Sequence, residues 1–385
     1  MTRPPVSPRP NRRDFLRAAT LGVAACAATS CAAHPTEQQP ASSPVPPDAY
    51  HLTGDIAGYR TKLTLLGTAA GPLAVAGRTG TASVLTVGDR PYLIDAGPWS
   101  SRKLVQAGID AASLGGVFVT HLHSDHISDL VNMFWLPGGT PSYRFVAVVP
   151  IYGPGSAGRL SAPPGGKPIP IQRAGNPTPG LSEMFSEVLD AYAYETNIRN
   201  TEKGAQASYA KRLALHDVAP PKFVGASADN TAPAMAPFPI FEDDRVRVTA
   251  TLVPHGPVFP SLAYRFDTDD GSVTFSGDTA RSQNLVALAK DSEILVHEVI
   301  DVDFYAKSSP DTALVEHMKL AHTSSPDVGR VATDANARRV VLSHIGPGDP
   351  RQVSDDRWET GVRLTYRGTV TVGHDLIQMG VGQRR

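Results

Sequence analysis

The sequence predicts a layered α/β protein. Apolar segments with the length of strands gather in two clusters, at about residues 61–120 and 247–344, and stretches with helical patterning separate some of them. Strand clusters in each half with helices between them indicate sheets covered by helices. The chain has 385 residues, of which 41% are hydrophobic, enough for a sizeable core.

The first cluster of predicted strands begins near Thr61. Three stretches have the apolar, turn-bounded pattern of strands: TKLTLLGT, the pair around the GDR turn in ASVLTVGDRPYLIDAG, and GGVFVT. Helical patterns follow at residues 101–107 and 127–136, and the second ends at Pro137 and two glycines.

The region at about residues 138–240 changes composition. A Pro/Gly-rich stretch, YGPGSAGRLSAPPGGKPIPIQRAGNPTPG, precedes a helical one, LSEMFSEVLDAYAYETNIRN. We expect this region to be an insertion over a single domain, residues 59–385, and not a second core. Helical stretches are predicted at 282–289 and 326–332, and the later strands are RVRVTATLVPH, SLAYRFDT, SVTFSGD, EILVHEVI, RRVVLSH and GTVTVGHDLIQM.

Residues 1–33 have the order of an export signal. Arg12 and Arg13 stand before Phe15 in RRDFL, and a short Ala-rich stretch ending in small residues follows. This core resembles the twin-arginine export signal. We therefore expect export to the periplasm or another extracytoplasmic location.

Both cysteines, Cys26 and Cys31, lie at the end of this signal. Either could carry a lipid anchor, and simple cleavage near Ala33 is an equally open alternative. The domain is left without a thiol, which excludes disulfides and thiolate metal ligands there. Residues 34–58, rich in Pro, Ser and Gln, are expected to be a flexible linker.

The charge of the chain without its signal is mildly acidic. Removing residues 1–33 removes five arginines and one aspartate, which takes the formal net charge from −1 to −5. An acidic domain is a poor electrostatic match for nucleic acid. We therefore expect no nucleic acid partner, and the oligomeric state stays open.

The stretch THLHSDH, residues 120–126, gathers four metal-capable side chains. His121 and His123 are two positions apart and point the same way if the backbone stays extended. Asp125 and His126 fall where the chain turns into the next predicted helix. One segment can thus offer two histidines to one metal and an Asp-His pair to another, and these donors suit zinc, iron or manganese.

Three further candidate ligands each end a predicted strand. His255 ends TATLVPH, Asp278 ends SVTFSGD and His344 ends RRVVLSH. Together with THLHSDH, their order predicts one joint site.

This order of residues resembles the metallo-β-lactamase superfamily, over roughly residues 61–380 and including LGT and LIDAG before the motif. The resemblance implies a four-layer αββα sandwich with the metals between sheet edges. It also implies two divalent metal ions, with zinc expected and manganese or iron as alternatives. The implied ligands are His121, His123 and His255 for one ion, Asp125, His126 and His344 for the other, and Asp278 as the bridge.

A finer resemblance points to the ribonuclease Z and arylsulfatase-like branch. HEVI at His297 and HTSS at His322 look like the His-Glu-Ala-Thr and His-Ser-Thr segments of that branch. The resemblance implies that His322 assists departure of the leaving group, and Glu298 could hold its other nitrogen. Several antibiotic-degrading members lack a bridging carboxylate like Asp278, so a β-lactamase is not expected.

We therefore predict an exported dinuclear hydrolase that cleaves small sulfate or phosphate esters, arylsulfatase-like or phosphodiesterase-like, with a metal-bridging hydroxide that Asp125 orients. One alternative is a lactonase or thioesterase, which the ligand set also permits. Another is a ribonuclease Z-like nuclease, against which export, the acidic domain and the position of the inserted region all argue.

The other side chains that stand out receive weaker roles. Phe134 and Trp135 could be substrate walls, and so could the helical stripe of Phe185, Leu189 and Tyr192, which could equally be core. His297 is expected to be structural, and His317, on a helix face, to be solvated.

Overall fold

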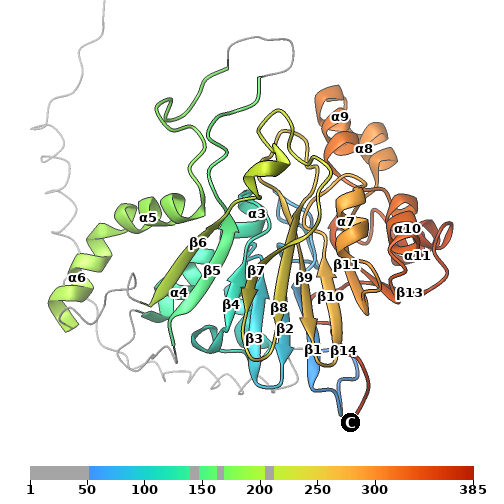
Figure 1. Cartoon of the computed structure of the whole chain (residues 1–385), viewed down its shortest axis with the longest axis horizontal. Helices are drawn as coiled ribbons and strands as arrows, with labels where there is room; N and C mark the ends of the chain where they lie inside the picture. Colours follow the sequence, from blue (N-terminus) through green and yellow to red (C-terminus); the bar gives the residue numbers. More distant parts are fainter. Residues whose placement is uncertain (1–51, 139–146, 163–168, 204–211) are drawn as a thin grey trace, which may run out of the picture. The chain divides into compact units, whose positions relative to one another are not determined.

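Two mixed sheets form the centre of the domain in the computed structural model, which describes residues 52–138, 147–162, 169–203 and 212–385 (Figure 1). Each sheet has seven strands within this part of the chain. The first sheet has the order β14-β1-β2-β3-β4-β5-β6, and the second has the order β13-β12-β11-β10-β9-β8-β7.

The strand bounds follow the predicted strands closely in most cases. The first sheet contains β1 (Thr61–Gly67), β2 (Ala82–Val87), β3 (Arg90–Ile94), β4 (Gly116–Phe118), β5 (Val149–Pro154), β6 (Leu213–Val218) and β14 (Gln378–Val381). The second contains β7 (Phe238–Glu242), β8 (Arg247–Leu252), β9 (Leu262–Thr268), β10 (Gly271–Phe275), β11 (Ile294–Ile300), β12 (Arg339–Gly346) and β13 (Thr369–Val372).

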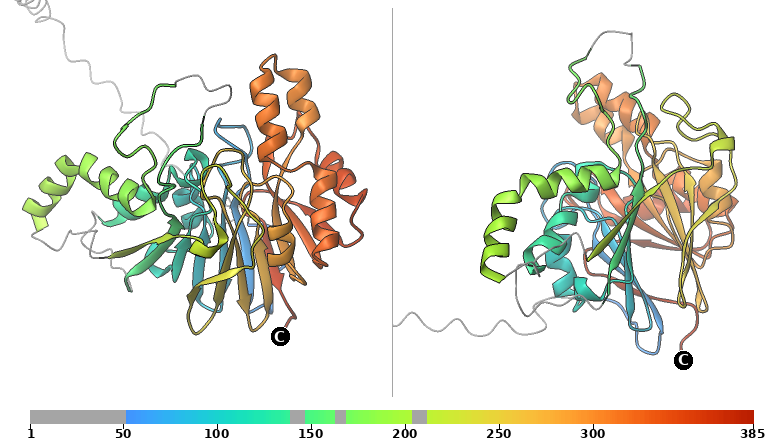
Figure 2. Two further views of the ribbon diagram at one scale, coloured as in Figure 1. Left: turned by 45° about the horizontal axis from the view of Figure 1, so that its top comes forward. Right: turned by 60° about the vertical axis from the view of Figure 1, so that its left-hand side comes forward.

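Helices pack on the outer face of each sheet (Figure 2). Among the described residues, the first half contains α2 (Ser100–Gln106), α3 (Ser124–Ile127), α4 (Leu130–Gly138), α5 (Leu181–Ala191) and α6 (Ala193–Lys203). Those of the second half are α7 (Gln283–Leu288), α8 (Val302–Ser308), α9 (Thr312–Ala321), α10 (Ser325–Asp334) and α11 (Asp355–Arg363). No helix in the described ranges is both long and apolar enough to span a bilayer.

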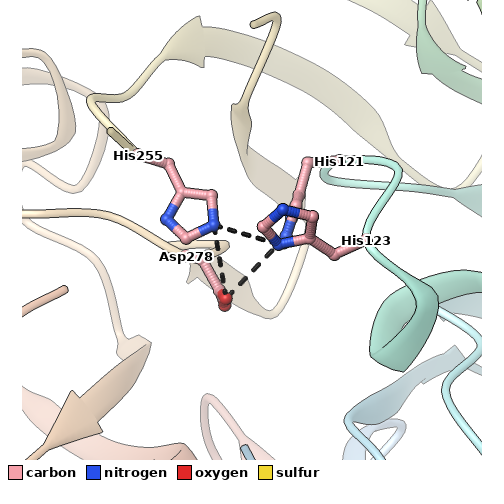
Figure 3. Close-up of side chains that lie close together, drawn as sticks. All are labelled: His121, His123, His255 and Asp278. Carbon is pink, nitrogen blue, oxygen red and sulfur yellow. Dashed lines mark hydrogen bonds and ion pairs between the residues drawn. The ribbon is translucent and has the colours of Figure 1, made fainter. Parts of the chain in front are cut away.

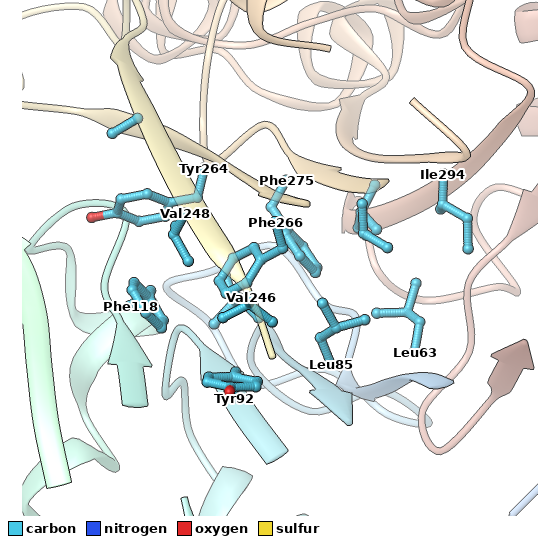
Figure 4. Close-up of a cluster of buried hydrophobic side chains, with 14 of the residues drawn as sticks. Leu63, Leu85, Tyr92, Phe118, Val246, Val248, Tyr264, Phe266, Phe275 and Ile294 are labelled. Carbon is cyan, nitrogen blue, oxygen red and sulfur yellow. The ribbon is translucent and has the colours of Figure 1, made fainter. Parts of the chain in front are cut away.

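Three apolar clusters separate the layers. The cluster between the sheets takes side chains from both of them and centres on aromatic residues, with the rings of Phe118 and Phe266 5.0 Å apart (Figure 4). A second cluster joins the first sheet to α2, α4 and α5, and a third joins the second sheet to α7, α10 and α11. These helix-sheet-sheet-helix layers confirm the predicted α/β sandwich.

The inserted region is smaller than predicted. Three stretches within 138–240 are strands of the core sheets: β5 pairs with β4, β6 pairs with β5, and β7 pairs with β8. Two prolines and a glycine within β5, Pro150, Gly153 and Pro154, hide its strand pattern, because they are typical of turns. Only the segments between these strands, including α5 and α6, lie outside the sheets.

The ends of the chain also differ from the predictions. The final segment forms two strands in different sheets, β13 and β14, and not one. The predicted linker ends early, because Thr53 exchanges backbone hydrogen bonds with Leu376 and Gln378. The export signal, Cys26 and Cys31 lie outside the described residues.

Candidate metal centre

The end of β4 positions the first group of candidate ligands. Thr120 follows this strand, and its backbone N–H donates to Asp95 Oδ1 at 2.7 Å while its carbonyl accepts from the N–H of Leu262. Thr120 is thereby fixed to both sheets. The chain stays extended through His123, which caps α3, so that Asp125 and His126 lie in the first turn of that helix.

One group of donors contains His121, His123, His255 and Asp278 (Figure 3). His121 Nε2 and His255 Nε2 each lie 3.8 Å from Asp278 Oδ2. His255 Nε2 lies 3.2 Å from His123 Nδ1. The three imidazoles therefore face one point beside the carboxylate.

A second group shares the same aspartate and contains Asp125, His126, Asp278 and His344. His344 Nε2 lies 3.2 Å from Asp125 Oδ2 and 3.1 Å from Asp278 Oδ2. His126 Nε2 lies 3.3 Å from Asp278 Oδ1. Asp278 thus stands between the two groups, as a bridging ligand would.

The donor set fits two divalent cations. Metal–ligand distances of 2.0–2.2 Å place tetrahedral donors about 3.3–3.6 Å apart, close to the separations found here. His121 Nε2 is buried and has no hydrogen-bond partner among the described residues, which is costly unless something binds it. Imidazole and carboxylate donors without thiolate suit zinc, and also manganese or iron.

Electrostatics at the site also favour a cation. Burial lowers the pKa of His121, and it lowers that of His255 to about 3, so both rings are neutral as metal ligands must be. Burial raises the pKa of Asp278, but the charges of His344 and His126 outweigh it and hold that pKa well below its usual value. Two ionised carboxylates, Asp125 and Asp278, therefore stand in a buried site beside the neutral rings of His121 and His255. Burial lowers the pKa of His126, but the charges of Asp278 and Asp95 outweigh it and raise that pKa well above its usual value.

Hydrogen bonds behind the donors fix which atoms face the centre. His126 Nδ1 donates to Asp95 Oδ2 at 2.9 Å, and His255 Nδ1 donates to the carbonyl of Ala321 at 2.9 Å. Each bond leaves Nε2 free for a metal. Sequence reasoning missed Asp95, although it ends a strand in LIDAG as the candidate ligands end theirs.

Gly71 is another residue that the sequence did not single out. Its N–H donates to Asp125 Oδ2 at 3.0 Å. A Cβ at this position would lie 2.2 Å from Asp125 Cβ, so only glycine allows this approach. The backbone loop after β1 thus holds Asp125 from behind.

His322 and Glu298 lie together beside both groups. His322 Nδ1 is 3.0 Å from Glu298 Oε1, which also accepts from the N–H of Thr279 at 2.7 Å. Burial lowers the pKa of His322, but the charge of Glu298 and its hydrogen bond outweigh burial and raise the pKa to about 9. The His322 ring stacks on His344 with centroids 5.8 Å apart.

The family follows from a comparison with known proteins. Residues 75–320 match the family model described as the metallo-beta-lactamase superfamily. The chain belongs to this superfamily. It is a hydrolase of the metallo-β-lactamase fold, and its histidine and aspartate clusters support binding of divalent metal.

Relatives place it near one branch of the superfamily. Proteins named ribonuclease Z from Mycobacterium bovis and Mycobacterium tuberculosis are 26% identical over 329 residues, which cover 84% of this chain and 99% of theirs. The crystal structure of human tRNase Z, short form, has a TM-score of 0.55 at 18% identity and covers 84% of this chain and 100% of its own. The crystal structure of the metallo-beta-lactamase fold protein YhfI from Bacillus subtilis has a TM-score of 0.53 at 17% identity. The match covers 83% of this chain and 98% of YhfI.

These relatives correct one prediction. We expected no nucleic acid partner from the acidic net charge, but the relatives are named for action on RNA. Net charge averages the whole surface, whereas a nuclease needs favourable charge only where the strand is cut. The acidic balance of this metallo-β-lactamase domain is therefore no argument against RNA.

His317 is closer to the metal centre than predicted. Its ring centroid lies 5.6 Å from that of His322 and 6.1 Å from that of His255, and the residue is half-buried. The helix face predicted to be solvated is only partly exposed at His317, because His322 is the C-cap of α9 and the last turns of this helix run beside the site. His297 is buried and its Nδ1 donates to the carbonyl of Glu298, in accord with a structural role.

Two of the proposed aromatic walls, Phe134 and Phe185, belong to the core. Phe134 and Phe185 are each 1% exposed and pack in the cluster between the first sheet and its helices. Leu189 joins the same cluster. The stripe therefore faces the sheet at Phe185 and Leu189, whereas Tyr192, the C-cap residue of α5, is 41% exposed. The side chain of Trp135 lies outside the described part of the structure.

Proposed function

We propose that this chain is a dinuclear metal-dependent phosphodiesterase, with RNA among its substrates. The proposal is carried by the His322–Glu298 pair, which adds a proton donor to the two adjoining donor groups. The similarity to proteins named ribonuclease Z supports the same bond type.

The residues that would hold the metals are the two donor groups described above. His121, His123 and His255 would bind one ion and Asp125, His126 and His344 the other, with Asp278 shared. Zinc fits best, and manganese or iron are alternatives. Two such ions would supply positive charge to the phosphate oxygens and lower the pKa of an attacking water.

The side chains of the protein provide orientation and a proton. Asp125 is held by Gly71, so one of its oxygens is fixed and can accept a hydrogen bond from the attacking water. His322 holds its Nδ1 proton against Glu298, which leaves Nε2 to donate to the leaving oxygen. His322 and Glu298 are both buried, which keeps bulk water from competing for that proton.

Leaving groups decide between the candidate ester classes. An alkoxide, such as the ribose oxygen of RNA, is a poor leaving group and needs a proton in the transition state. A thiolate needs much less assistance, and so gives no reason for a buried His-Glu pair. The pair therefore favours a phosphodiester over a thioester.

A substrate panel tests the proposal. The purified chain, loaded with zinc or manganese, would be assayed on bis-p-nitrophenyl phosphate, p-nitrophenyl sulfate, a lactone, a thioester and an RNA with an extended 3′ end. We expect hydrolysis of the diester and the RNA, abolished in Asp278→Ala. Sulfate hydrolysis without diester hydrolysis would assign the chain to the arylsulfatase-like class, and activity only on lactone or thioester would also overturn the proposal.

We also propose that residues 1–33 direct export. Fused to a reporter enzyme that works only outside the cytoplasm, this segment should give activity that Arg12→Lys together with Arg13→Lys removes. Unchanged activity in the double variant would refute the twin-arginine route.

A further inference from the structure

A pocket of about 500 Å³ adjoins the metal centre at Asp125. Its walls include Pro72, Leu73, Val75, Arg78, Trp99 and Lys103. A pocket of this size holds a group as large as a nucleoside. Neither His322 nor Glu298 lines it, so it is separate from the proton-donating side of the centre.

Trp99 is unusual in both exposure and backbone. The residue is 56% exposed, and it stands before α2 with φ of 75°, in the left-handed region. Bulky residues rarely adopt this conformation, and strained backbone gathers at ligand sites. Leu73, 79% exposed, comes from a different segment and lines the same pocket.

Fixed cations stand beside this apolar wall. The backbone N–H of Lys103 donates to the carbonyl of Trp99, so both residues lie on one side of the first helical turn. Lys103 Nζ lies 3.2 Å from Asp375 Oδ2, an atom that also accepts from the N–H and hydroxyl of Thr79. Arg78 is 5% exposed, and its Nε has no hydrogen-bond partner in the described part of the chain.

We propose that this pocket binds an aromatic group on the part of the substrate that keeps the phosphate, with that group stacked on Trp99. The inference rests on the proposed phosphodiesterase function. A nucleobase and an aryl ring share the flat face that stacks on indole, and the phosphate would extend from it toward Asp125. Lys103 and Arg78 are each paired with a carboxylate, Asp375 and Asp355, so the pocket selects the ring by stacking and not by net positive charge.

Binding of products tests this inference without turnover. Adenosine 5′-monophosphate, phenyl phosphate and methyl phosphate would be titrated calorimetrically into the metal-loaded chain. We expect the two aromatic probes to bind roughly 10-fold or more tightly than methyl phosphate, as stacking on one aromatic side chain allows. Tight binding of adenosine 5′-monophosphate alone would identify the bound ring as a nucleobase, and tight binding of phenyl phosphate alone would identify it as a simple aryl group.

Variants separate the ring from the fold. Trp99→Gly removes the ring and relieves the left-handed backbone, so we expect roughly 10-fold weaker binding of the aromatic probes with unchanged binding of methyl phosphate. Trp99→Phe should retain most of the affinity, and Val105→Ala, at an exposed position of α2 outside the pocket, should change nothing.

Fluorescence provides a second readout. The chain has three tryptophans, and quenching by adenosine 5′-monophosphate should be lost in Trp99→Phe. Equal affinity of Trp99→Gly and the unaltered chain for aromatic probes would overturn the inference. Stacking without diester hydrolysis would instead refute only the proposed function, which keeps the two failures distinct.

Discussion

The two sides of the metal centre differ in what they expose. On one side, His322 and Glu298 are buried, charged and bound to each other, with exposed fractions of 9% and 2%. On the other side, Trp99 and Leu73 are exposed and apolar around an open pocket. A proton donor needs a fixed position and a controlled pKa, whereas recognition of a flat ring needs open space. Variants on each side should therefore change different kinetic parameters.

The centre shared by both sides should give the largest effect. Asp278→Ala removes the residue common to both donor groups, so we expect the rate on bis-p-nitrophenyl phosphate to fall by roughly 10³-fold or more. Bound metal, measured by mass spectrometry, should fall from two ions per chain to one or fewer. Asp303→Asn, at an exposed position in α8, is the matched control. Two ions retained in Asp278→Ala would rule out the bridging role.

On the buried side, leaving groups sharpen the comparison. His322→Ala should slow diesters with alkoxide leaving groups by about 10²–10⁴-fold, because they depend on a general acid. Nitrophenyl diesters should lose far less, since nitrophenolate leaves without a proton. A plot of rate against leaving-group pKa measures the difference. Equal losses for both classes would show that His322 is not the acid.

The closed packing around Asp125 gives a smaller effect. Gly71→Ala places a Cβ where Asp125 stands, so the carboxylate must move and metal affinity should fall by roughly 10-fold. Competition with a fluorescent chelator measures that affinity. Gly175→Ala, where an added Cβ meets no atom within 4 Å, should leave it unchanged. Unaltered affinity in Gly71→Ala would mean that Asp125 is not positioned by this loop.

The smallest effect is a change of proton affinity in the metal-free chain. Burial lowers the pKa of His322, and the charge of Glu298 outweighs burial and raises that pKa to about 9, so the pKa should fall in Glu298→Gln. Imidazole NMR signals followed over pH measure this. In the unaltered chain the raised pKa stabilises the fold fully below pH 6.5, and this contribution is lost as pH rises through 9. A His322 pKa unchanged by the substitution would contradict the pairing.

Much of the fold and centre could be predicted because the relevant signals are local. His121 to His126 lie in one segment. His255 and Asp278 each follow a strand whose apolar pattern is clear, and His344 lies near the end of such a strand. The supports of the centre depend on contacts between distant segments, such as Gly71 with Asp125. No periodicity reveals that contact, nor the return of the final strand to the first sheet.

Other predictions failed because a local pattern has two readings. The stripe containing Phe185 is compatible with a lid or with packing on a sheet, and only the position of α5 decides between them. His317 resembles a solvated residue until α9 is seen to end at the centre. The pocket beside Trp99 could not be predicted, because the sequence does not reveal that this tryptophan has a left-handed backbone conformation.

The most direct test of the dinuclear phosphodiesterase is a metal titration. Zinc would be added stepwise to the metal-free chain while bound metal and the rate of bis-p-nitrophenyl phosphate hydrolysis are measured together. The two adjoining donor groups predict that activity rises as the second ion binds and reaches its plateau at two ions per chain. Full activity with a single ion, or none with two ions bound, would contradict this account.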